Sequence, residues 1–234
     1  HLYPHVHAAT VRLLTWYSFD VNIPAQQTCC GALHAHSGDT QMTSDLAQSN
    51  IDLFENTDSD YIIINSAGCG SHLKSNIKYM EAGISGKILD LSEFLIRMET
   101  KQVSNGRLLK VAYDEPCHLL HGQGVSAEPK SLLSQIPGIE LVSLKEADRC
   151  CGSAGSYSLT ETEMSLELLE RKMDAVMETS ADILVTANPG CQIQLAWGVR
   201  RRKIKMEVLH LAQFLDRIFS NEPGYPTEPT AKAN

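Results

Sequence analysis

The residues of this chain with the most distinctive chemistry are its seven cysteines, four of which form two adjacent pairs. Cys29 stands next to Cys30, and Cys150 stands next to Cys151. A disulfide between neighbouring cysteines closes a strained ring, whereas neighbouring thiolates bind metal without one. Seven cysteines among 234 residues are also too few for a disulfide scaffold. The pairs therefore indicate metal chemistry in a reducing compartment, with buried structural thiols as the alternative.

These cysteines belong to an internal repeat. The Cys-Cys-Gly segment at 29–31 recurs at 150–152, and the Gly-Cys pair at 68–69 recurs at 190–191. In each half an apolar run precedes the Gly-Cys pair by the same number of residues, and Leu91–Leu95 resembles Leu211–Leu215. Several independent landmarks at one spacing are hard to produce by chance. The sequence therefore predicts two similar halves.

The repeat sets the expected domain boundaries. The first half is predicted over residues 1–97 and the second over 108–219, with polar residues 98–107 linking them. Residues 220–234 are rich in proline and polar residues and are predicted to be a disordered tail. Cys117 opens the second half, and its counterpart at the same spacing would lie upstream of His1. We therefore expect the first half to be truncated at its N-terminus in this sequence.

Both halves read as alternating helices and strands, which predicts an α/β fold with mostly parallel strands. Apolar residues at helical spacing predict helices over 7–17, 40–55, 129–136 and 210–219. Apolar runs of strand length predict strands over 19–23, 61–65, 108–113, 139–144 and 183–186. Asp39 or Thr40 is the expected cap of the second of these helices, and Thr160 with Glu163 fits a capping box.

The cysteines fall at comparable places along this pattern. Each Gly-Cys pair follows a predicted buried strand and precedes a helix, and each Cys-Cys-Gly segment leads through a loop to a helix. Because ligands in parallel α/β folds lie outside the carboxyl ends of the strands, the thiolates of one half are expected to converge. The predicted ligand set of the second half is Cys117, Cys150, Cys151 and Cys191, and that of the first half is Cys29, Cys30 and Cys69.

Soft thiolates select zinc, copper(I) or iron–sulfur clusters. Structural zinc sites usually contain two C-x₂-C knuckles. The second half has none, because 32 residues separate Cys117 from Cys150 and 39 separate Cys151 from Cys191. This spacing favours an iron–sulfur cluster over zinc, although four cysteines alone leave both open.

Histidines flank the cysteine motifs and offer a second kind of contact. His34 and His36 follow the first Cys-Cys-Gly segment, and His118 and His121 follow Cys117. A histidine there replaces a missing thiolate or donates a hydrogen bond to sulfur and tunes its potential. We take His34 and His118 as the candidates for this role, with ordinary polar lining as the alternative for each.

The composition of the chain argues against some classes of binding partner. The net charge of −8 argues against nucleic acid, whose phosphates call for basic surface. No apolar run approaches the roughly 18–20 residues that span a bilayer. The basic run at 200–203 is either a solvated turn or a docking patch for a partner or anionic lipid. No Ser–His–Asp set and no pair of catalytic carboxylates is evident.

The two cysteine motifs resemble the cysteine-rich CCG domain family. That family includes lactate-utilisation proteins, the iron–sulfur subunit of glycolate oxidase, and components of heterodisulfide reductase and of the anaerobic glycerol-3-phosphate dehydrogenase. The segments Cys29–Gly38, Cys150–Gly155 and Asn188–Leu195 are most similar to the glycolate oxidase protein, and the resemblance covers roughly residues 1–219.

The resemblance implies an iron–sulfur electron-transfer subunit of a flavin-dependent glycolate dehydrogenase complex. Substrate oxidation would take place on an FAD-binding flavoprotein partner, and electrons would pass through a [4Fe-4S] cluster of this chain to an acceptor such as quinone. The complex is expected in the cytoplasm, with peripheral association at the inner face of the membrane. The family's ferredoxin-like N-terminal region lies outside these 234 residues.

The chain departs from the fullest form of the family motif, which ends in Cys-x-x-Cys. Gln194 stands three residues after Cys191, and Cys69 is followed by His72 and Leu73 with no further cysteine. One ligand per half is therefore missing relative to that pattern, and a regular four-cysteine cluster is the expectation for the second half. A zinc-stabilised assembly module is the main alternative. A heterodisulfide-reductase-like site is a weaker alternative, because its ligand set would be incomplete.

Overall fold

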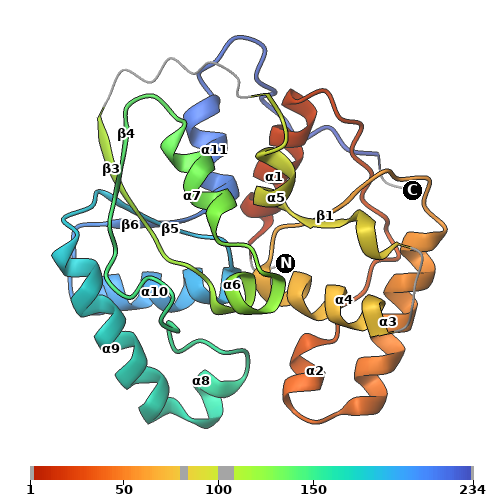
Figure 1. The fold of residues 1–234 in the computed structure, drawn as a ribbon, viewed down its shortest axis with the longest axis horizontal. Coiled ribbons are helices and arrows are strands. Elements are labelled where there is room, and N and C mark those ends of the chain that lie inside the picture. The colour runs from red at the N-terminus through yellow and green to blue at the C-terminus, as the bar shows by residue number, and fades with distance from the viewer. Residues whose placement is uncertain (1–2, 80–83, 100–107, 233–234) are drawn as a thin grey trace.

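A computed structural model of the protein describes residues 3–79, 84–99 and 108–232 (Figure 1). Its strands form two separate sheets, one in each half of the chain, and every strand pair is parallel. The prediction of an α/β fold with mostly parallel strands is confirmed. Most of the predicted linker, residues 100–107, lies outside the described residues.

The second half contains a four-stranded sheet in the order β4-β3-β5-β6. Its strands are β3 (Leu109–Tyr113), β4 (Ile139–Val142), β5 (Ile183–Thr186) and β6 (Glu207–His210). Its helices are α6 (Cys117–Gln123), α7 (Ala127–Ser134), α8 (Tyr157–Thr160), α9 (Thr162–Glu178), α10 (Pro189–Arg201) and α11 (Leu211–Phe219). The predicted strands over 108–113, 139–144 and 183–186 are confirmed within one or two residues.

Side chains of this sheet alternate between two hydrophobic layers, because successive residues of a strand point to opposite faces. Val111 and Val185 face a core formed with α7 and α11, whereas Ala112 and Leu184 face a core formed with α9 and α10. Figure 1 shows the two helix layers on opposite sides of the sheet. Both faces of the central strands are thus covered, as their continuous apolar runs predict.

The first half has the same order of elements around a smaller sheet. Its helices are α1 (Pro4–Trp16), α2 (Ala32–His36), α3 (Thr40–Glu55), α4 (Ala67–Tyr79) and α5 (Leu91–Leu95), with a 3₁₀ turn η1 (Ser85–Lys87). Two strands, β1 (Ile62–Ile64) and β2 (Ile88–Asp90), pair in parallel. The series α3-β1-α4-β2-α5 corresponds to α9-β5-α10-β6-α11. The predicted helices over 7–17 and 40–55 and the strand over 61–65 are confirmed.

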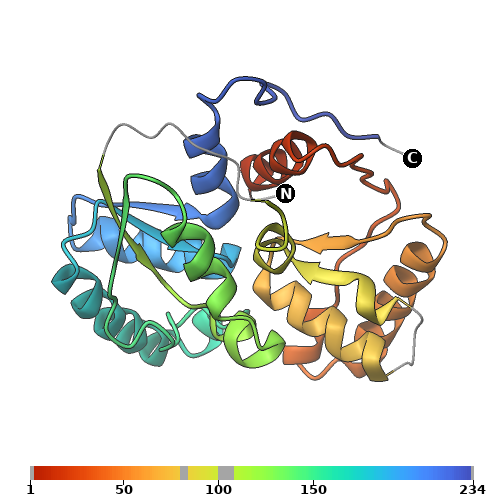
Figure 2. The same ribbon diagram turned by 45° about the horizontal axis from the view of Figure 1, so that its top comes forward.

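The two halves share one central core. Helix α1 packs against α11 of the second half, and α7 packs against α5 of the first half. Leu13 of α1, Phe94 of α5, Leu133 of α7 and Phe214 of α11 are all fully buried in this core. Figure 2 shows these helices between the two sheets. Because each half lends a helix to the other, their relative position is set by packed apolar side chains.

Two predictions about local structure are wrong. Residues 19–23 form no strand, and Asn22 makes only an isolated bridge to Lys232. The segment 19–23 corresponds to β4 of the second half, which pairs with β3. Among the described residues, the first half has no strand equivalent to β3, so apart from the bridge to Lys232 this segment has no strand to pair with. The capping box at Thr160 also does not form, because Thr160 ends α8 and Glu161 precedes α9 without a side-chain cap.

The sequence predicts a disordered tail over residues 220–234. In the structure, this segment is instead held against the rest of the chain as far as Lys232. The ring of Tyr225 packs at 5.3 Å from that of Trp16, and its hydroxyl donates a hydrogen bond to Asp216. The backbone NH of Lys232 bonds the carbonyl of Val21 at 2.9 Å. The segment therefore lies along α1 (Figure 2), because one buried aromatic ring and this backbone pairing hold it there.

None of the helices in the described part of the chain has both the length and the apolar character needed to cross a membrane.

Candidate metal centre

The predicted metal ligands of the second half lie in segments that follow three strands, at one edge of the sheet. Cys117 is the first residue of α6, which follows β3, and Cys191 lies in the first turn of α10, which follows β5. The pair Cys150 and Cys151 lies in the loop after β4. These are the carboxyl ends of parallel strands, where α/β folds bind their ligands. Pro116 and Pro189 end the extended segments and start the two helices.

The four thiols of this group form a continuous chain of contacts. Hydrogen bonds link Cys117 to Cys150, Cys150 to Cys151, and Cys151 to Cys191. Hydrogen bonds from Cys117 and Cys151 hold the pKa of Cys150 well below its ordinary value, whereas the pKa values of its two donors are raised. Four soft sulfur donors thus lie next to one another. We refer to these residues as the second cysteine group.

Polar groups around the second cysteine group point hydrogen atoms at sulfur. The backbone NH of Gly152 lies 3.3 Å from Sγ of Cys150, and the amide of Asn188 lies 3.5 Å from Sγ of Cys191. The Nδ1 atom of His118 lies 3.6 Å from Sγ of Cys117, and the tautomer of the ring decides which of the two atoms donates. The two amide donors, together with the N-termini of two helices, stabilise negative charge on sulfur. This environment suits an anionic cluster held by thiolates.

The first half gathers a smaller set, the first cysteine group. Cys30 is buried and donates a hydrogen bond to Cys69, which lies in the first turn of α4. This bond, with another from Ser66, lowers the pKa of Cys69 to about 6 against the opposing effect of burial. Cys29 is exposed beside them. The structure therefore brings two thiols together here and leaves the third at the surface.

The cysteine-bearing helices of the two halves lie side by side. Helix α4 packs against α6, and the close approach requires glycine, since a Cβ at Gly122 would lie 2.1 Å from the Ser71 hydroxyl. The side chain of Gln123 donates to the carbonyl of Ala67 at 3.0 Å, and the NH of Gly68 bonds Asn188 at 3.3 Å. The two cysteine groups thus sit on either side of one tightly packed joint.

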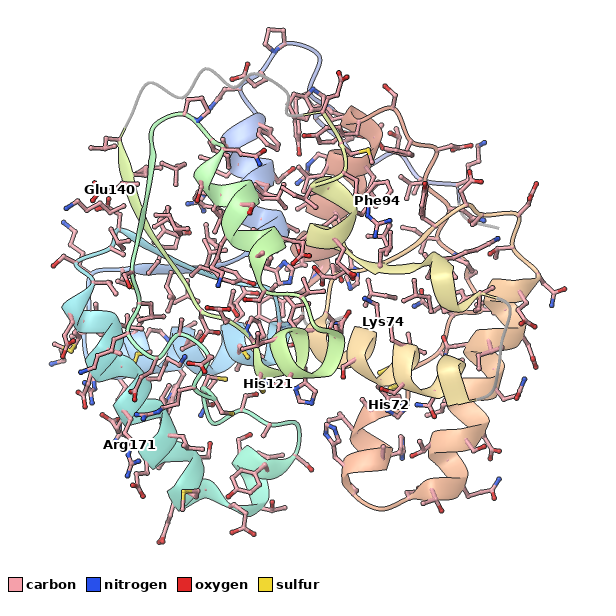
Figure 3. All side chains as sticks on the ribbon, viewed as in Figure 1. His72, Lys74, Phe94, His121, Glu140 and Arg171 are labelled. Carbon is pink, nitrogen blue, oxygen red and sulfur yellow. The ribbon has the colours of Figure 1, made fainter. Side chains whose placement is uncertain are left out.

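The histidines are placed differently from one another. The ring of His118 lies 5.6 Å from that of His36, between the halves. Nδ1 of His34 lies 3.5 Å from Asp39, and the side chain of His34 is 41% exposed. Of the two candidates that the sequence indicates, one therefore lies beside a thiol and the other on the surface. His121 is exposed, and Figure 3 shows it on α6 near His72 of α4.

The positions that lack the family's further cysteine occupy equivalent places. Gln194 of α10 lies against Gly152, and His72 of α4 lies against Gly31, each 3.3 Å from where a Cβ would stand. Each side chain thus covers the glycine that follows its cysteine pair. His72 places an imidazole beside Gly31, the residue that follows Cys30, and burial lowers the pKa of His72. His72 is not among the predicted site residues, although its position three residues after Cys69 is the one that the longer motif assigns to a ligand.

A buried ion pair beneath the second cysteine group was also missed. Nζ of Lys172 lies 2.9 Å from Asp114, and the other oxygen of this carboxylate accepts a bond of 2.9 Å from Thr186. The signal was present in the sequence, because Lys172 stands on the same helical stripe as Leu169 and Met173. A lysine on an apolar stripe indicates a buried partner.

The second cysteine group offers four soft sulfur donors. Among the His, Cys, Asp and Glu residues that the structure describes, no group of three or more is placed to hold one metal ion. The thiols of the second cysteine group instead follow one another in a chain. A polynuclear cluster takes one thiolate per iron, so its ligands surround a volume and do not meet at one point. The donor set, four thiols with amide donors, is also the soft set that iron–sulfur clusters use.

Comparison with known proteins agrees with the duplicated pattern. The sequence model of the CCG cysteine-rich domain matches residues 1–74 and 111–196, one copy in each half. These two matches contain all seven cysteines of the chain.

Three curated relatives align with almost the whole chain. A protein described as the probable glycolate oxidase iron–sulfur subunit of Bacillus subtilis is 40% identical, over 88% of this chain and 50% of the relative. The B component of a fumarate reductase (CoM/CoB) from Methanothermobacter marburgensis is 32% identical, over 94% of this chain and 44% of the relative. Lactate utilization protein A of Halalkalibacterium halodurans is 30% identical, over 92% and 91%. The chain thus spans about half the length of the first two relatives.

Proposed function

This chain belongs to the cysteine-rich CCG domain family, and from that membership we propose that it is an iron–sulfur electron-transfer subunit of an oxidoreductase complex. The complex that we propose is a flavin-dependent dehydrogenase of 2-hydroxy acids, with glycolate as the substrate. The observation that carries the proposal is the chain of four thiols at the carboxyl ends of β3, β4 and β5. The similarity to the glycolate oxidase protein of Bacillus subtilis supports the choice of substrate.

Each residue of the second cysteine group has a part in this proposal. Cys117, Cys150, Cys151 and Cys191 would hold a [4Fe-4S] cluster, which supplies one-electron transfer when bound. The NH of Gly152 and the amide of Asn188 favour the thiolate form of their cysteines through hydrogen bonds. Nδ1 of His118, 3.6 Å from Sγ of Cys117, would donate to the thiolate form of that cysteine. The helix N-termini at Cys117 and Cys191 offset the negative charge of four thiolates.

The first cysteine group is proposed as a second, less complete site. Cys30 and Cys69 are in contact, and Cys29 lies at the surface within the same loop. We propose residues 1–97 and 108–219 as the two halves of the chain, each with its own cysteine group. The core shared by α1, α5, α7 and α11 keeps the two groups at a constant separation, which electron transfer between two sites requires.

The proposed complex needs a partner subunit that oxidises the substrate. This chain offers sulfur ligands suited to electron transfer, and we propose that an FAD-binding subunit removes the hydride from the hydroxy acid. Electrons would then pass through this chain to an acceptor such as quinone. Docking at the cytoplasmic face of the membrane stays a prediction.

The proposal is tested by the transfer itself. The whole complex is mixed anaerobically with glycolate, and the visible absorption of the iron–sulfur chromophore is followed in time, with lactate in a parallel run. We expect bleaching by glycolate and recovery on addition of a quinone. A Cys150→Ser complex is expected to reduce its flavin normally and to stop there. Full transfer to quinone in that variant would show that electrons do not pass through the second cysteine group.

A further inference from the structure

A buried charge distinguishes the second cysteine group from the first. The side chain of Lys172 is 0% exposed, and its Nζ atom makes three polar contacts. It pairs with Asp114 at 2.9 Å and donates to the carbonyls of Ala147 at 2.8 Å and Glu146 at 3.3 Å. Burying an ammonium group is costly unless it is paired and hydrogen-bonded, and here both conditions are met.

The three partners of Lys172 lie on segments that lead directly into the cysteines. Asp114 follows β3 and precedes Cys117 by three residues, and Ala147 precedes Cys150 by three residues. The positive charge favours the thiolate of Cys150, whereas the negative charge of Asp114 disfavours the thiolate of Cys151. The two charges therefore act on the second cysteine group with opposite signs, and neither is screened by water because both side chains are buried.

The first half places a neutral side chain at the equivalent point. Asn50 occupies the position on α3 that Lys172 occupies on α9, and it is 1% exposed. Its amide donates to the carbonyls of Cys29 at 3.0 Å and Leu46 at 2.8 Å and to the hydroxyl of Thr28 at 3.1 Å. Both side chains thus brace the loop that enters a cysteine pair, but only Lys172 adds a charge.

We propose that Lys172, held in place by Asp114, sets the reduction potential of the second cysteine group above the value that the same cluster would have with a neutral residue there. The inference rests on the proposed function, since it requires a cluster at these cysteines. One electron from the flavoprotein lowers the charge of the cluster by one unit, and a fixed positive charge nearby stabilises that more negative state. Lys172 touches no cysteine and is therefore a positioning residue that acts through the field.

The test compares variants that change the charge with one that does not. Lys172→Met removes the positive charge and keeps an unbranched side chain of similar length, so the potential is expected to fall. Asp114→Asn removes the negative charge and is expected to raise it. Thr186→Val removes the 2.9 Å hydrogen bond to the same carboxylate without changing any charge, and its potential is expected to stay at the wild-type value.

The readout is a redox titration of the anaerobically purified protein, followed by electron paramagnetic resonance, with iron and sulfide measured in each sample. We expect each charge variant to change the ratio of reduced to oxidised cluster about tenfold at a fixed potential, which is about 59 mV for one electron. The signs must be opposite. Shifts of the same sign, or none in variants with full iron content, overturn the role of Lys172 and leave the proposed function standing.

The Asp114→Asn variant distinguishes an effect on folding from an effect on the reduction potential. If Lys172→Met contains no iron, the sign of the shift in Asp114→Asn decides, and a fall or no change overturns the inference. A wild-type protein that contains zinc and no sulfide contradicts the proposed function itself, and the inference fails with it.

Discussion

The two halves of this protein share a backbone plan and differ in what they place on it. Helices α4 and α10 occupy the same position in their halves, and the glycine after each cysteine pair has the same left-handed conformation, with φ of +88° at Gly31 and at Gly152. Yet four thiols are in contact in the second half and two in the first. The shared backbone plan therefore fixes the positions of the cysteines in each half. The side chains around them decide which metal centre each cysteine group can bind.

The two halves also differ in the buried side chains next to their cysteine groups. The second half buries an ion pair, Lys172 with Asp114, where the first half buries the amide of Asn50. It also continues its sheet with two further strands. Asp114 and Cys117 follow β3, and Cys150 and Cys151 follow β4. The second group is thus both more complete and more strongly charged in its surroundings. Substitutions at equivalent positions of the two halves test how far this contrast goes.

The largest contrast is expected at the two glycines with φ of +88°. A left-handed conformation costs a residue with a side chain about 1–2 kcal/mol, and this is the expected destabilisation by Gly31→Ala, whose Cβ would meet its neighbours at 3.3 Å. At Gly152 the Cβ would lie 2.3 Å from the backbone carbonyl oxygen of Ser165. Overpacking adds about 1–3 kcal/mol, so Gly152→Ala should cost about 2–5 kcal/mol.

Urea unfolding of the metal-free variants measures both values. Gly38→Ala is a suitable control, because this glycine also has a positive φ, of 79°, but no atom lies within 4 Å of its Cβ position. Equal losses at Gly152 and Gly38 would show that the backbone around Ser165 yields freely.

The next contrast concerns the residues that cap α5 and α11. Asp90 and His210 are equivalent, and each accepts a hydrogen bond from the backbone two residues later while the side chain of Glu93 or Gln213 bonds back to it. Burial shifts the pKa values of these two side chains in opposite directions. It raises the pKa of Asp90 to about 6 and lowers the pKa of His210 to about 4. Asparagine is a good substitute for either residue, because it also caps helices.

The two caps should give opposite pH dependences of stability. Asp90 binds a proton more tightly in the folded protein, so its contribution is greatest at low pH and is lost as the pH rises toward its pKa of about 6. His210 binds its proton less tightly in the folded protein, so its contribution is present above about pH 6.5 and is lost as the pH falls toward its pKa of about 4. Each effect is about 3 kcal/mol, from shifts of about two units.

Unfolding free energies of Asp90→Asn and His210→Asn, measured from pH 4 to pH 7, check this. Relative to wild type, His210→Asn should gain stability as the pH falls, and Asp90→Asn should lose it. Parallel curves for wild type and both variants would mean that neither group titrates differently in the folded and unfolded states.

The smallest contrast is expected at the starts of α3 and α9. Asp39 caps α3 by accepting a 3.0 Å bond from the NH of Met42, whereas Glu161 makes no such bond at α9. Asp39→Ala should therefore cost about 1 kcal/mol, and Glu161→Ala should change the unfolding free energy by much less. A thermal unfolding experiment on the two variants distinguishes them. Equal losses would show that the bond to Met42 contributes nothing net.

Much of this architecture could be predicted from the sequence because the repeat and the apolar patterns are local signals. The strand at 183–186 and the helix that Asp39 caps were predictable from their own residues. The segment at 19–23 has an equally good strand pattern, but a strand also needs a neighbour, and none of the described strands lies beside it. Whether a partner exists is a property of the whole fold, which periodicity cannot supply.

The candidate site shows the same division. The cysteine spacing was enough to predict that Cys117, Cys150, Cys151 and Cys191 meet, because strand ends converge in a parallel sheet. It was not enough to distinguish His118, which reaches a thiol, from His34, which turns to the surface. Nor did it find Lys172, whose burial is indicated by the apolar stripe that it shares with Leu169 and Met173 and not by the cysteines.

The central claim is that the second cysteine group holds a [4Fe-4S] cluster. The direct test is to purify the natural protein anaerobically and to determine iron, zinc and acid-labile sulfide per chain, with spectra of the oxidised and reduced forms, for wild type, Cys150→Ser and Cys29→Ser. We expect about four iron and four sulfide per occupied site, with the redox-responsive signal of the second group lost in Cys150→Ser and kept in Cys29→Ser. Stoichiometric zinc with no sulfide and no signal in the wild-type protein would contradict the claim and leave a structural metal site in its place.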